Sequence, residues 1–178
     1  SASSACDACG VGFAGASGVC SVCAAGSEPN ALSTACTACV AGEAGTAGVC
    51  STCDVGSQPL ADRTACESCA SLPNSANLFS TDGSACAACG PGHAVDAGHT
   101  SCSICAYGLY SSDGAACLSC SAGFQPHDPA GGLSPPAAGA DGCDACVLIG
   151  DDTYSDVGTV CEPCALGQEP VPDRTSCI

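Results

Sequence analysis

The stretch Cys36-Thr-Ala-Cys-Val-Ala-Gly-Glu-Ala-Gly-Thr-Ala-Gly-Val-Cys-Ser-Thr-Cys53 contains two Cys-x-x-Cys doublets separated by ten residues, and its recurrence decides the fold class. The doublets of the whole chain are Cys6/Cys9, Cys20/Cys23, Cys36/Cys39, Cys50/Cys53, Cys66/Cys69, Cys86/Cys89, Cys102/Cys105, Cys117/Cys120, Cys143/Cys146 and Cys161/Cys164. The 21 cysteines therefore form ten doublets, with Cys177 left over. Such regular recurrence predicts tandem repeats in place of one globular core.

The composition favours small units that are held together by disulfides. The chain has 178 residues but only three Phe, three Tyr and no Trp or Met, and much of its apolar fraction is Ala and Cys, so hydrophobic burial is a weak driving force. Cysteine exceeds the roughly 8–10% that marks disulfide scaffolds. This content predicts an oxidising, extracellular compartment.

The charge of the chain excludes two classes of partner. The formal net charge is -16, and the only Arg or Lys residues are Arg63 and Arg174. Nucleic acid and anionic membranes both require a basic surface, so neither is expected to bind. No segment approaches the ~20 apolar residues of a membrane span, so no direct membrane insertion is expected. Any leader or anchor is expected to lie outside these residues.

Aligning the doublets gives five modules, each holding two doublets. The predicted boundaries are 6–35, 36–65, 66–101, 102–142 and 143–178; the fourth module contains a Pro/Gly-rich loop at 121–142, and the fifth ends with the start of a next module. In each module the two spacers differ, which indicates two unlike halves.

Glycines at repeated positions predict turns. One glycine lies two or three residues before the closing cysteine of each first half, at Gly18, Gly48, Gly83, Gly114 and Gly158, where we expect a turn with positive φ. A second glycine follows eight of the ten doublets by three residues. Such close spacing favours short hairpins and leaves little room for helix. An aromatic residue stands seven positions before the closing cysteine in four first halves, where a ring could bury area beside a disulfide.

Two further features lie in the second halves. Arg63 and Arg174 occur in matching Asp-Arg-Thr segments, and we expect them to bond nearby carbonyls or Asp. Ser134-Pro135-Pro136, in the 121–142 loop, resembles the serine-proline motifs of algal and plant wall glycoproteins, which implies possible glycosylation at these three residues. The alternative is an ordinary flexible loop. The chain has no Asn-x-Ser/Thr sequon, so any sugar would be O-linked.

The segment Cys102-Ser-Ile-Cys-Ala-Tyr-Gly-Leu-Tyr-Ser-Ser-Asp-Gly-Ala-Ala-Cys117 resembles the growth-factor-receptor type of cysteine-rich repeat. Ephrin-receptor-like and furin-like repeats are similar in pattern, as are the arrays of ciliate immobilisation antigens, diplomonad variant surface proteins and some algal surface or flagellar-hair proteins. The resemblance covers nearly the whole chain but implies a scaffold and no specific activity. The low Lys content and the Ala/Gly/Ser richness resemble a protist or algal protein more than an animal receptor.

The resemblance also implies a disulfide pairing, first to third and second to fourth within each module. The pairs are Cys6–Cys20, Cys9–Cys23, Cys36–Cys50, Cys39–Cys53, Cys66–Cys86, Cys69–Cys89, Cys102–Cys117, Cys105–Cys120, Cys143–Cys161 and Cys146–Cys164, with Cys177 unpaired within the chain. A sequential pairing, Cys9–Cys20, Cys23–Cys36 and so on to Cys164–Cys177, remains open and leaves Cys6 over. We favour the first pairing because the two halves differ. Either way one terminal cysteine lacks a partner, which favours a segment cut from a longer array or covalent joining of subunits.

Zinc is the main alternative to disulfides, because two doublets supply a four-thiolate ligand set and five modules could bind five ions. Each site would carry a charge of -2, adding about -10 to a chain that is already acidic. We therefore expect disulfides, and neither a metal nor a cofactor.

Other candidate sites are weaker. His93, Asp96 and His99 could touch a metal, and Asp141, Asp144, Asp151, Asp152 and Asp156 could hold Ca²⁺ weakly, but neither set has the spacing of a known site. His127 belongs to the 121–142 loop. Ten near-equivalent doublets do not offer the single low-pKa thiol of a redox enzyme. We expect no catalytic residues and no enzyme.

These observations predict a small disulfide-rich fold of tandem modules, with short β-hairpins and little helix, forming an elongated rod. The expected function is that of an extracellular structural protein, a segment of a cell-surface coat, filament or fibre that is a candidate for O-glycosylation. The alternatives are the stalk or ligand-binding ectodomain of a surface receptor or adhesin, and a zinc-binding array. The expected partners are further copies or neighbouring modules, and O-linked glycans.

Overall fold

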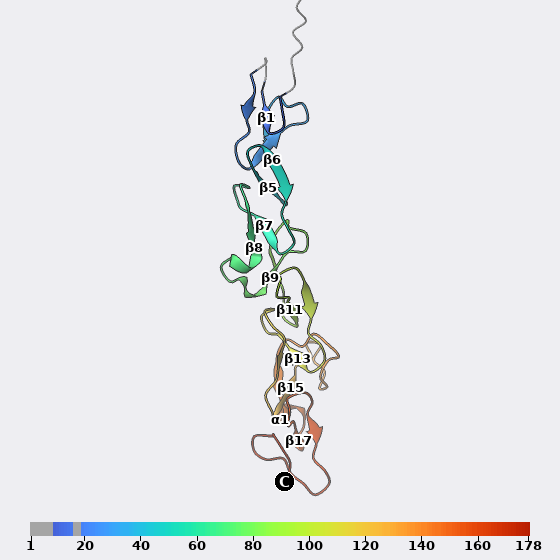
Figure 1. Ribbon diagram of the computed structural model, residues 1–178. Coiled ribbons are helices and arrows are strands. Elements are labelled where there is room, and N and C mark those ends of the chain that lie inside the picture. Colours follow the sequence, from blue (N-terminus) through green and yellow to red (C-terminus); the bar gives the residue numbers. More distant parts are fainter. Residues whose placement is uncertain (1–8, 16–18) are drawn as a thin grey trace, which may run out of the picture. The chain divides into compact units, whose positions relative to one another are not determined.

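The computed structural model describes residues 9–15 and 19–178 of the chain (Figure 1). It divides into two compact units. Unit 1 comprises the described residues up to Ser75 together with Phe79–Ala87 and Gly98–Thr100, and unit 2 comprises Ala76–Leu78, Ala88–Ala97 and Ser101–Ile178. Each unit consists of short antiparallel hairpins closed by disulfides, as the composition predicts.

Ten disulfides divide the described chain into ten successive closed loops. In chain order, loops 1 to 10 are Cys9–Cys20, Cys23–Cys36, Cys39–Cys50, Cys53–Cys66, Cys69–Cys86, Cys89–Cys102, Cys105–Cys117, Cys120–Cys143, Cys146–Cys161 and Cys164–Cys177. Loops 1 to 5 are closed within unit 1, and loops 6 to 10 are closed by cysteines of unit 2. The second cysteine of each doublet thus opens a loop, and the first cysteine of the next doublet closes it.

The pairing implied by the family resemblance is therefore wrong, and the sequential pairing is the one that forms. The pairs that do not form are Cys6–Cys20, Cys9–Cys23, Cys36–Cys50, Cys39–Cys53, Cys66–Cys86, Cys69–Cys89, Cys102–Cys117, Cys105–Cys120, Cys143–Cys161 and Cys146–Cys164. Cys177, predicted to lack a partner, is bridged to Cys164. Cys6 lies outside the described residues.

The backbone conformation of the doublets explains this pairing. The two residues between the cysteines lie in short strands, for example Ser21–Val22 and Cys36–Ala38. Side chains alternate between the faces of an extended segment, so positions three apart point to opposite sides. One cysteine of a doublet therefore faces the preceding loop and the other faces the following loop. The bridges Cys23–Cys36, Cys53–Cys66, Cys89–Cys102 and Cys120–Cys143 consequently span the predicted module boundaries.

The strands of the first five loops are two to four residues long. They are β1 (Phe13–Ala14), β2 (Ser21–Val22), β3 (Ser27–Pro29), β4 (Cys36–Ala38), β5 (Glu43–Thr46), β6 (Val49–Thr52), β7 (Ser57–Pro59), β8 (Cys66–Ser68), β9 (Leu78–Phe79) and β10 (Ala87–Ala88). Antiparallel pairs join β1 to β2, β3 to β4, β5 to β6 and β7 to β8. Two single-turn 3₁₀ helices, η1 (Cys69–Ser71) and η2 (Ser75–Asn77), occupy the longer loop 5.

The remaining loops repeat this design. Their elements are β11 (His93–Val95), β12 (Cys102–Ile104), β13 (Leu109–Tyr110), β14 (Leu118–Ser119), β15 (Phe124–Pro126), β16 (Cys143–Ala145), α1 (Cys146–Ile149), β17 (Thr153–Tyr154) and β18 (Glu162–Pro163). Each odd-numbered strand pairs antiparallel with the even-numbered strand that follows it. None of the helices among the described residues has the length and apolar character needed to cross a bilayer.

In eight of the ten loops, a glycine three residues after the doublet forms the turn with which the loop begins. In loop 3 the Glu43 N–H donates to the Val40 carbonyl at 3.1 Å, and the intervening Gly42 has a φ of 83°. A turn with positive φ at its third position strongly favours glycine there. The predicted positive φ before the closing cysteine is also confirmed at Gly48, Gly83, Gly114 and Gly158, whereas Gly18 lies outside the described residues.

Disulfides and small side chains form the buried interior. The cysteines that open loops 2 to 9 are at most 5% exposed, whereas the cysteines that close loops are mostly half-buried or exposed. The other buried residues are small or polar, such as Ala14, Ala44, Ser80 and Ser111. The expectation that aromatic rings bury area beside the disulfides is wrong at Phe13, which is 43% exposed. Sulfur, in place of rings, fills the narrow interior.

Candidate functional site: the stacking surface between loops

Backbone hydrogen bonds connect each loop to the loop that follows it. They are Gly15 N–H to Ser33 O, Gly26 to Gly45, Gly45 to Arg63, Gly56 to Ser80, Ser80 to His99, Gly92 to Ser111, Ser111 to Ala140, Gly123 to Ser155 and Ser155 to Arg174, at 2.7–3.0 Å. All nine bonds lie within one unit or the other. We call these bonds, with the surfaces that they join, the stacking ladder.

In loops 3, 5, 7 and 9, one residue near the tip of the loop is hydrogen-bonded to both the preceding and the following loop. Gly45 of loop 3 accepts from the Gly26 N–H at 2.8 Å and donates its own N–H to the Arg63 carbonyl at 3.0 Å. Ser80, Ser111 and Ser155 do the same in loops 5, 7 and 9. These residues therefore transmit backbone pairing from one even-numbered loop to the next.

The three serines at this position are buried for a local reason. Ser80, Ser111 and Ser155 are at most 2% exposed. Each hydroxyl accepts from the N–H of a glycine three residues later, at 3.0–3.1 Å. A serine side chain that bonds the backbone in this way stabilises a tight turn. The sequence signal for this arrangement is Ser-x-x-Gly directly after an aromatic residue. The turn at the glycine was predicted from the sequence. The burial of the serine and its backbone bonds to both neighbouring loops were not predicted.

The residue that receives the bond in an even-numbered loop commonly adopts a left-handed conformation. Ser33, Arg63, His99 and Arg174 have φ values of 53–60°. Such values are uncommon for residues other than glycine and persist where the surrounding structure requires them. Here the strained backbone presents a carbonyl to the preceding odd-numbered loop. Sequence reasoning missed these positions because only two of them share the Asp-Arg-Thr segment.

Loops also approach too closely for side chains at the stacking surface. A Cβ at Gly26 would collide with the Asp62 carbonyl oxygen, and one at Gly123 would collide with that of Asp173. Both glycines are buried. Glycine is therefore required at this position twice over, by its positive φ and by the neighbouring backbone.

In loops 4 and 8, a glutamine two residues after the turn glycine and directly before a proline adds a second link to the following loop. Gln58 Oε1 accepts from the Cys86 N–H at 2.9 Å, and Gln125 Oε1 accepts from the Cys161 N–H at the same distance. Gln125 is only 1% exposed. Its Nε2 also donates to the Leu133 carbonyl at 2.8 Å, so both ends of the amide are satisfied.

The prediction of a structural role for both arginines is confirmed. Arg63 donates to the Cys39 carbonyl, and Arg174 donates to the carbonyls of Gly150, Asp151 and Thr153. The preceding Asp62 accepts from the Thr64 N–H at 3.1 Å and from its hydroxyl at 2.8 Å, which lowers the pKa of Asp62. The Asp-Arg-Thr segment thus anchors a turn of one loop to another loop.

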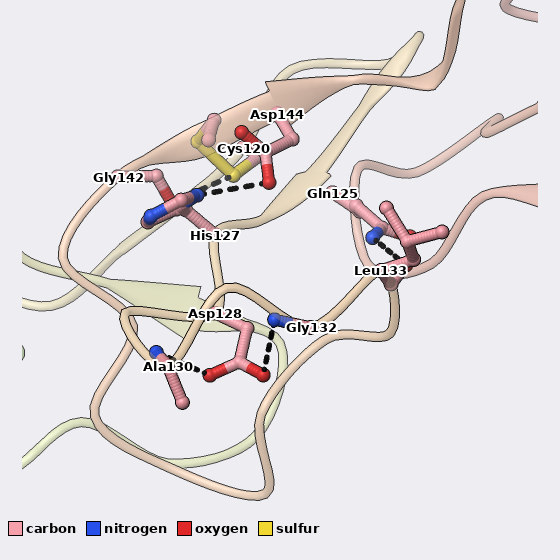
Figure 2. A network of polar contacts seen from close by, with 10 residues as sticks. Cys120, Gln125, His127, Asp128, Ala130, Gly132, Leu133, Gly142 and Asp144 are labelled. Atoms are coloured by element: carbon pink, nitrogen blue, oxygen red, sulfur yellow. Dashed lines mark hydrogen bonds and ion pairs between the residues drawn. A yellow bond between two sulfur atoms is a disulfide. The ribbon is translucent and has the colours of Figure 1, made fainter. Parts of the chain in front are cut away.

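The 121–142 loop is part of loop 8 and is held by its own polar network (Figure 2). His127 Nδ1 lies 2.9 Å from Asp144 Oδ2. The hydrogen bond to Asp144 raises the pKa of His127, and the charges of Asp144, Asp141 and Asp128 act in the same direction against partial desolvation. Asp128 accepts from the N–H groups of Ala130 and Gly132 at 2.9 and 3.0 Å. These bonds fold the insertion back on its own base.

The candidate glycosylation residues lie on this insertion. Ser134 is exposed, and Pro135 and Pro136 are partly exposed. A modifying enzyme could therefore reach the serine hydroxyl. The exposure is also that of an ordinary surface loop, so glycosylation stays a prediction.

The structure does not assemble the weaker candidate metal sites. His93 and Asp96 belong to unit 2, whereas His99 belongs to unit 1 and receives the Ser80 N–H on its carbonyl. Within the described residues, the one set of three potential metal-ligating side chains whose atoms lie within 4.8 Å of one another is Glu28, Glu43 and Cys50. The Cys50 sulfur is bridged to Cys39, so this set offers two carboxylates. The five candidate calcium-binding aspartates do not appear in such a set.

All twenty described cysteines are in disulfides, so none of them is a thiolate donor for zinc. The sequence-based preference for disulfides over a zinc array is confirmed at these positions. A groove of about 510 Å³ in unit 2 is lined by Phe124, Val147 and the segment from Pro170 to Arg174. Its wall includes the close contact of Gly123 with Asp173, so the groove belongs to the stacking surface of loops 8 and 10.

Comparison of the chain with the models of known protein families finds no match, and neither does comparison with curated protein sequences. The chain is therefore described by what it contains: tandem cysteine-rich repeats, with ten disulfides and short hairpins.

Proposed function

We propose that this chain is a structural segment of an extracellular coat, filament or fibre, built from cysteine-rich repeats of the growth-factor-receptor type. The stacking ladder is the observation that carries the proposal. Nine backbone bonds connect successive loops. Five of them, from the Gly15 donor to the Ser80 donor, lie in unit 1, and the other four, from the Gly92 donor to the Ser155 donor, lie in unit 2. Dense disulfide bonding is typical of extracellular proteins.

The ladder suits a mechanical role because each loop is held in two ways. A disulfide closes it covalently, and backbone bonds fix it to the next loop. In the chain-entropy model a bridge closing a loop of this size contributes about 3 kcal/mol. A segment with almost no apolar core can then keep its shape outside the cell.

The proposal includes two kinds of partner. The first is further modules or copies of the same kind, because the contacts repeat from loop to loop. The second is O-linked sugar on the 121–142 loop, where Ser134 is exposed beside two prolines. We assign the chain no catalytic role.

Immunogold electron microscopy of the cells that make the protein tests this function. We expect label on fibres or coat material outside the plasma membrane, and we expect that label to persist after detergent removes the membrane. Label inside the cell, or label lost together with the membrane proteins, would contradict the proposal and would favour the receptor alternative in the second case. Peptide mass spectrometry of the same material checks the sugar on residues 121–142.

A further inference from the structure

We propose that this chain bears tension along a short covalent path through its disulfides and doublets, and that the loops between them are bypassed. The proposal rests on the proposed structural function and says how the segment carries load. Its basis is the sequential pairing, in which each bridge joins the two ends of one loop. A force that reaches one end of a loop therefore crosses to the other end through the disulfide. We call this route the load path.

The load path alternates between bridges and doublets. From Cys23 to Cys177 it crosses nine bridges, whose Cα–Cα distances are 5.4–5.9 Å, and the doublets connect one bridge to the next. An extended residue spans at most about 3.3–3.6 Å, so this path can reach a length of about 130 Å. The same stretch of chain without bridges would extend to about 520 Å. The bridges thus remove roughly three quarters of the length that tension could draw out.

The doublets on the load path are already extended in the folded chain. The two residues between their cysteines lie in the even-numbered strands, from Ser21–Val22 in β2 to Glu162–Pro163 in β18. Each strand residue rises about 3.3 Å, which is close to the limit of a stretched chain. Tension therefore finds little slack within a doublet. The loops hold the remaining slack, and the bridges keep the loops off the path.

Variation in spacing is confined to the parts that the load path bypasses. Every doublet has two residues between its cysteines, whereas bridged cysteines lie 11 to 23 positions apart. The longest spacing belongs to loop 8, which holds the 121–142 loop, and its bridge still spans only 5.9 Å. The added residues thus lengthen loop 8 without lengthening the load path. A sugar or a cut within 121–142 would leave that path intact.

The pairing that does not form would carry force differently. With bridges only inside each predicted module, residues 121–142 would be the sole covalent link between the fourth and fifth modules. Tension would stretch this spacer, and one cut in it would divide the chain. The observed bridge Cys120–Cys143 crosses the same spacer. The two pairings therefore predict opposite results for a cut at this place.

A specific cut in loop 8 tests the load path. A protease recognition sequence is inserted between Leu133 and Ser134, which are both exposed, in a protein that carries Cys6→Ser so that this cysteine cannot exchange with a bridge. We expect the cut chain to run as one species on a denaturing gel without reductant and as two with it. In the control, the same sequence lies between Leu118 and Ser119, inside a doublet, and both residues are again exposed. This control should separate without reductant.

Single-molecule stretching between terminal peptide tags measures the length of the load path. Cys120→Ser with Cys143→Ser opens loop 8, and we expect the contour length to increase by about 70 Å over the parent, because the whole loop replaces one bridge. Opening loop 4 with Cys53→Ser and Cys66→Ser should add only about 40 Å. A Gly/Ser insertion in residues 121–142 should leave the parent length unchanged and lengthen the chain only when loop 8 is open.

Three results would overturn the proposal. They are separation of the chain by the loop 8 cut without reductant, a doublet cut that leaves the chain in one piece, and a parent whose contour length grows with the Gly/Ser insertion. These measurements follow covalent connection, so a variant that loses some of its folding still gives an answer. None of them depends on where the protein lies in the cell, and the immunogold result can therefore fail or stand separately.

Discussion

Loop 8 and loop 10 share one design but differ in whether another loop covers them. In loop 8, Gly123 and Gln125 are buried against loop 9, and Cys120 is 5% exposed. In loop 10 the equivalent Gly167 and Glu169 are exposed, and Cys164 is half-buried. Both loops belong to unit 2, and both have the turn glycine in the same conformation. The hairpin is therefore a local property, whereas its burial comes from the neighbour.

Removing the disulfide of each loop should produce the largest difference in the free energy of unfolding between loop 8 and loop 10. We expect Cys120→Ala with Cys143→Ala to lower the free energy of unfolding by about 3–4 kcal/mol, because this bridge closes the longest loop and contacts its neighbours. Cys164→Ala with Cys177→Ala should cost less and loosen loop 10 alone. Thermal unfolding followed by circular dichroism measures both. Equal losses in the two variants would show that stacking adds nothing to the bridges.

Replacing the turn glycine should give the second-largest difference in stability between the two loops. Gly123→Ala places a methyl group against the Asp173 carbonyl oxygen, whereas Gly167→Ala meets no atom. The left-handed conformation alone costs about 1–2 kcal/mol at both positions. We expect a further loss of about 2 kcal/mol at Gly123 only, since the loops must separate. Hydrogen exchange at the Ser155 amide, which should accelerate in the Gly123 variant alone, gives the local readout.

Removing the side chain that links to the next loop should have a smaller effect. Gln125→Ala leaves the Cys161 N–H and the Leu133 carbonyl without their partner, at a cost of about 1–3 kcal/mol. Glu169→Ala removes an exposed group and should change the stability of the monomer very little. Chemical denaturation measures both variants. Gln125→Glu is the control that keeps the acceptor but loses the donor, and stability equal to wild type there would argue against the amide network.

The smallest difference in stability should come from a change of pH. It acts on the His127–Asp144 pair of loop 8, which has no counterpart in loop 10. His127 of loop 8 faces Asp144, with Asp141 and Asp128 nearby, and Val171 takes the equivalent place in loop 10. Because folding raises the pKa of His127, the pair contributes its stability below pH 6.5 and loses it as the pH rises through the raised pKa. The half-exposed imidazole limits the effect to a fraction of a kcal/mol.

Proton NMR titration of the His127 ring checks this prediction. Asp144→Asn should lower the pKa of His127 towards 6.5, since Asp144 supplies the largest cause of the shift. The raised pKa would persist in this variant if Asp141 and Asp128 alone were responsible. Amide exchange within residues 121–142 should also become faster above the titration midpoint, because the neutral imidazole binds the Asp144 carboxylate more weakly than the charged ring does.

The sequence correctly predicted the features that depend on residues close together in the chain. Doublets and glycines recur at fixed intervals, and a turn with positive φ needs only a few neighbouring residues, so Gly48 and Gly83 were found without a structure. The roles of Arg63 and Arg174 followed from their matching segments. Among the aromatic residues at this position, Phe13 was misjudged, because burial depends on what a neighbouring loop covers and Phe13 has no preceding loop among the described residues.

The sequence by itself determined that this chain is a tandem array of small disulfide-bonded hairpins, because cysteine spacing and turn glycines act over a dozen residues. The tertiary structure decided which cysteines pair, since an extended doublet turns its two sulfurs to opposite faces. It also decided that Gly45 and Ser155 join their neighbours and that Gly167 is left exposed. These contacts are hydrogen bonds between backbone atoms of separate loops. Every residue carries the same backbone groups, so the sequence of side chains does not indicate which of them will pair.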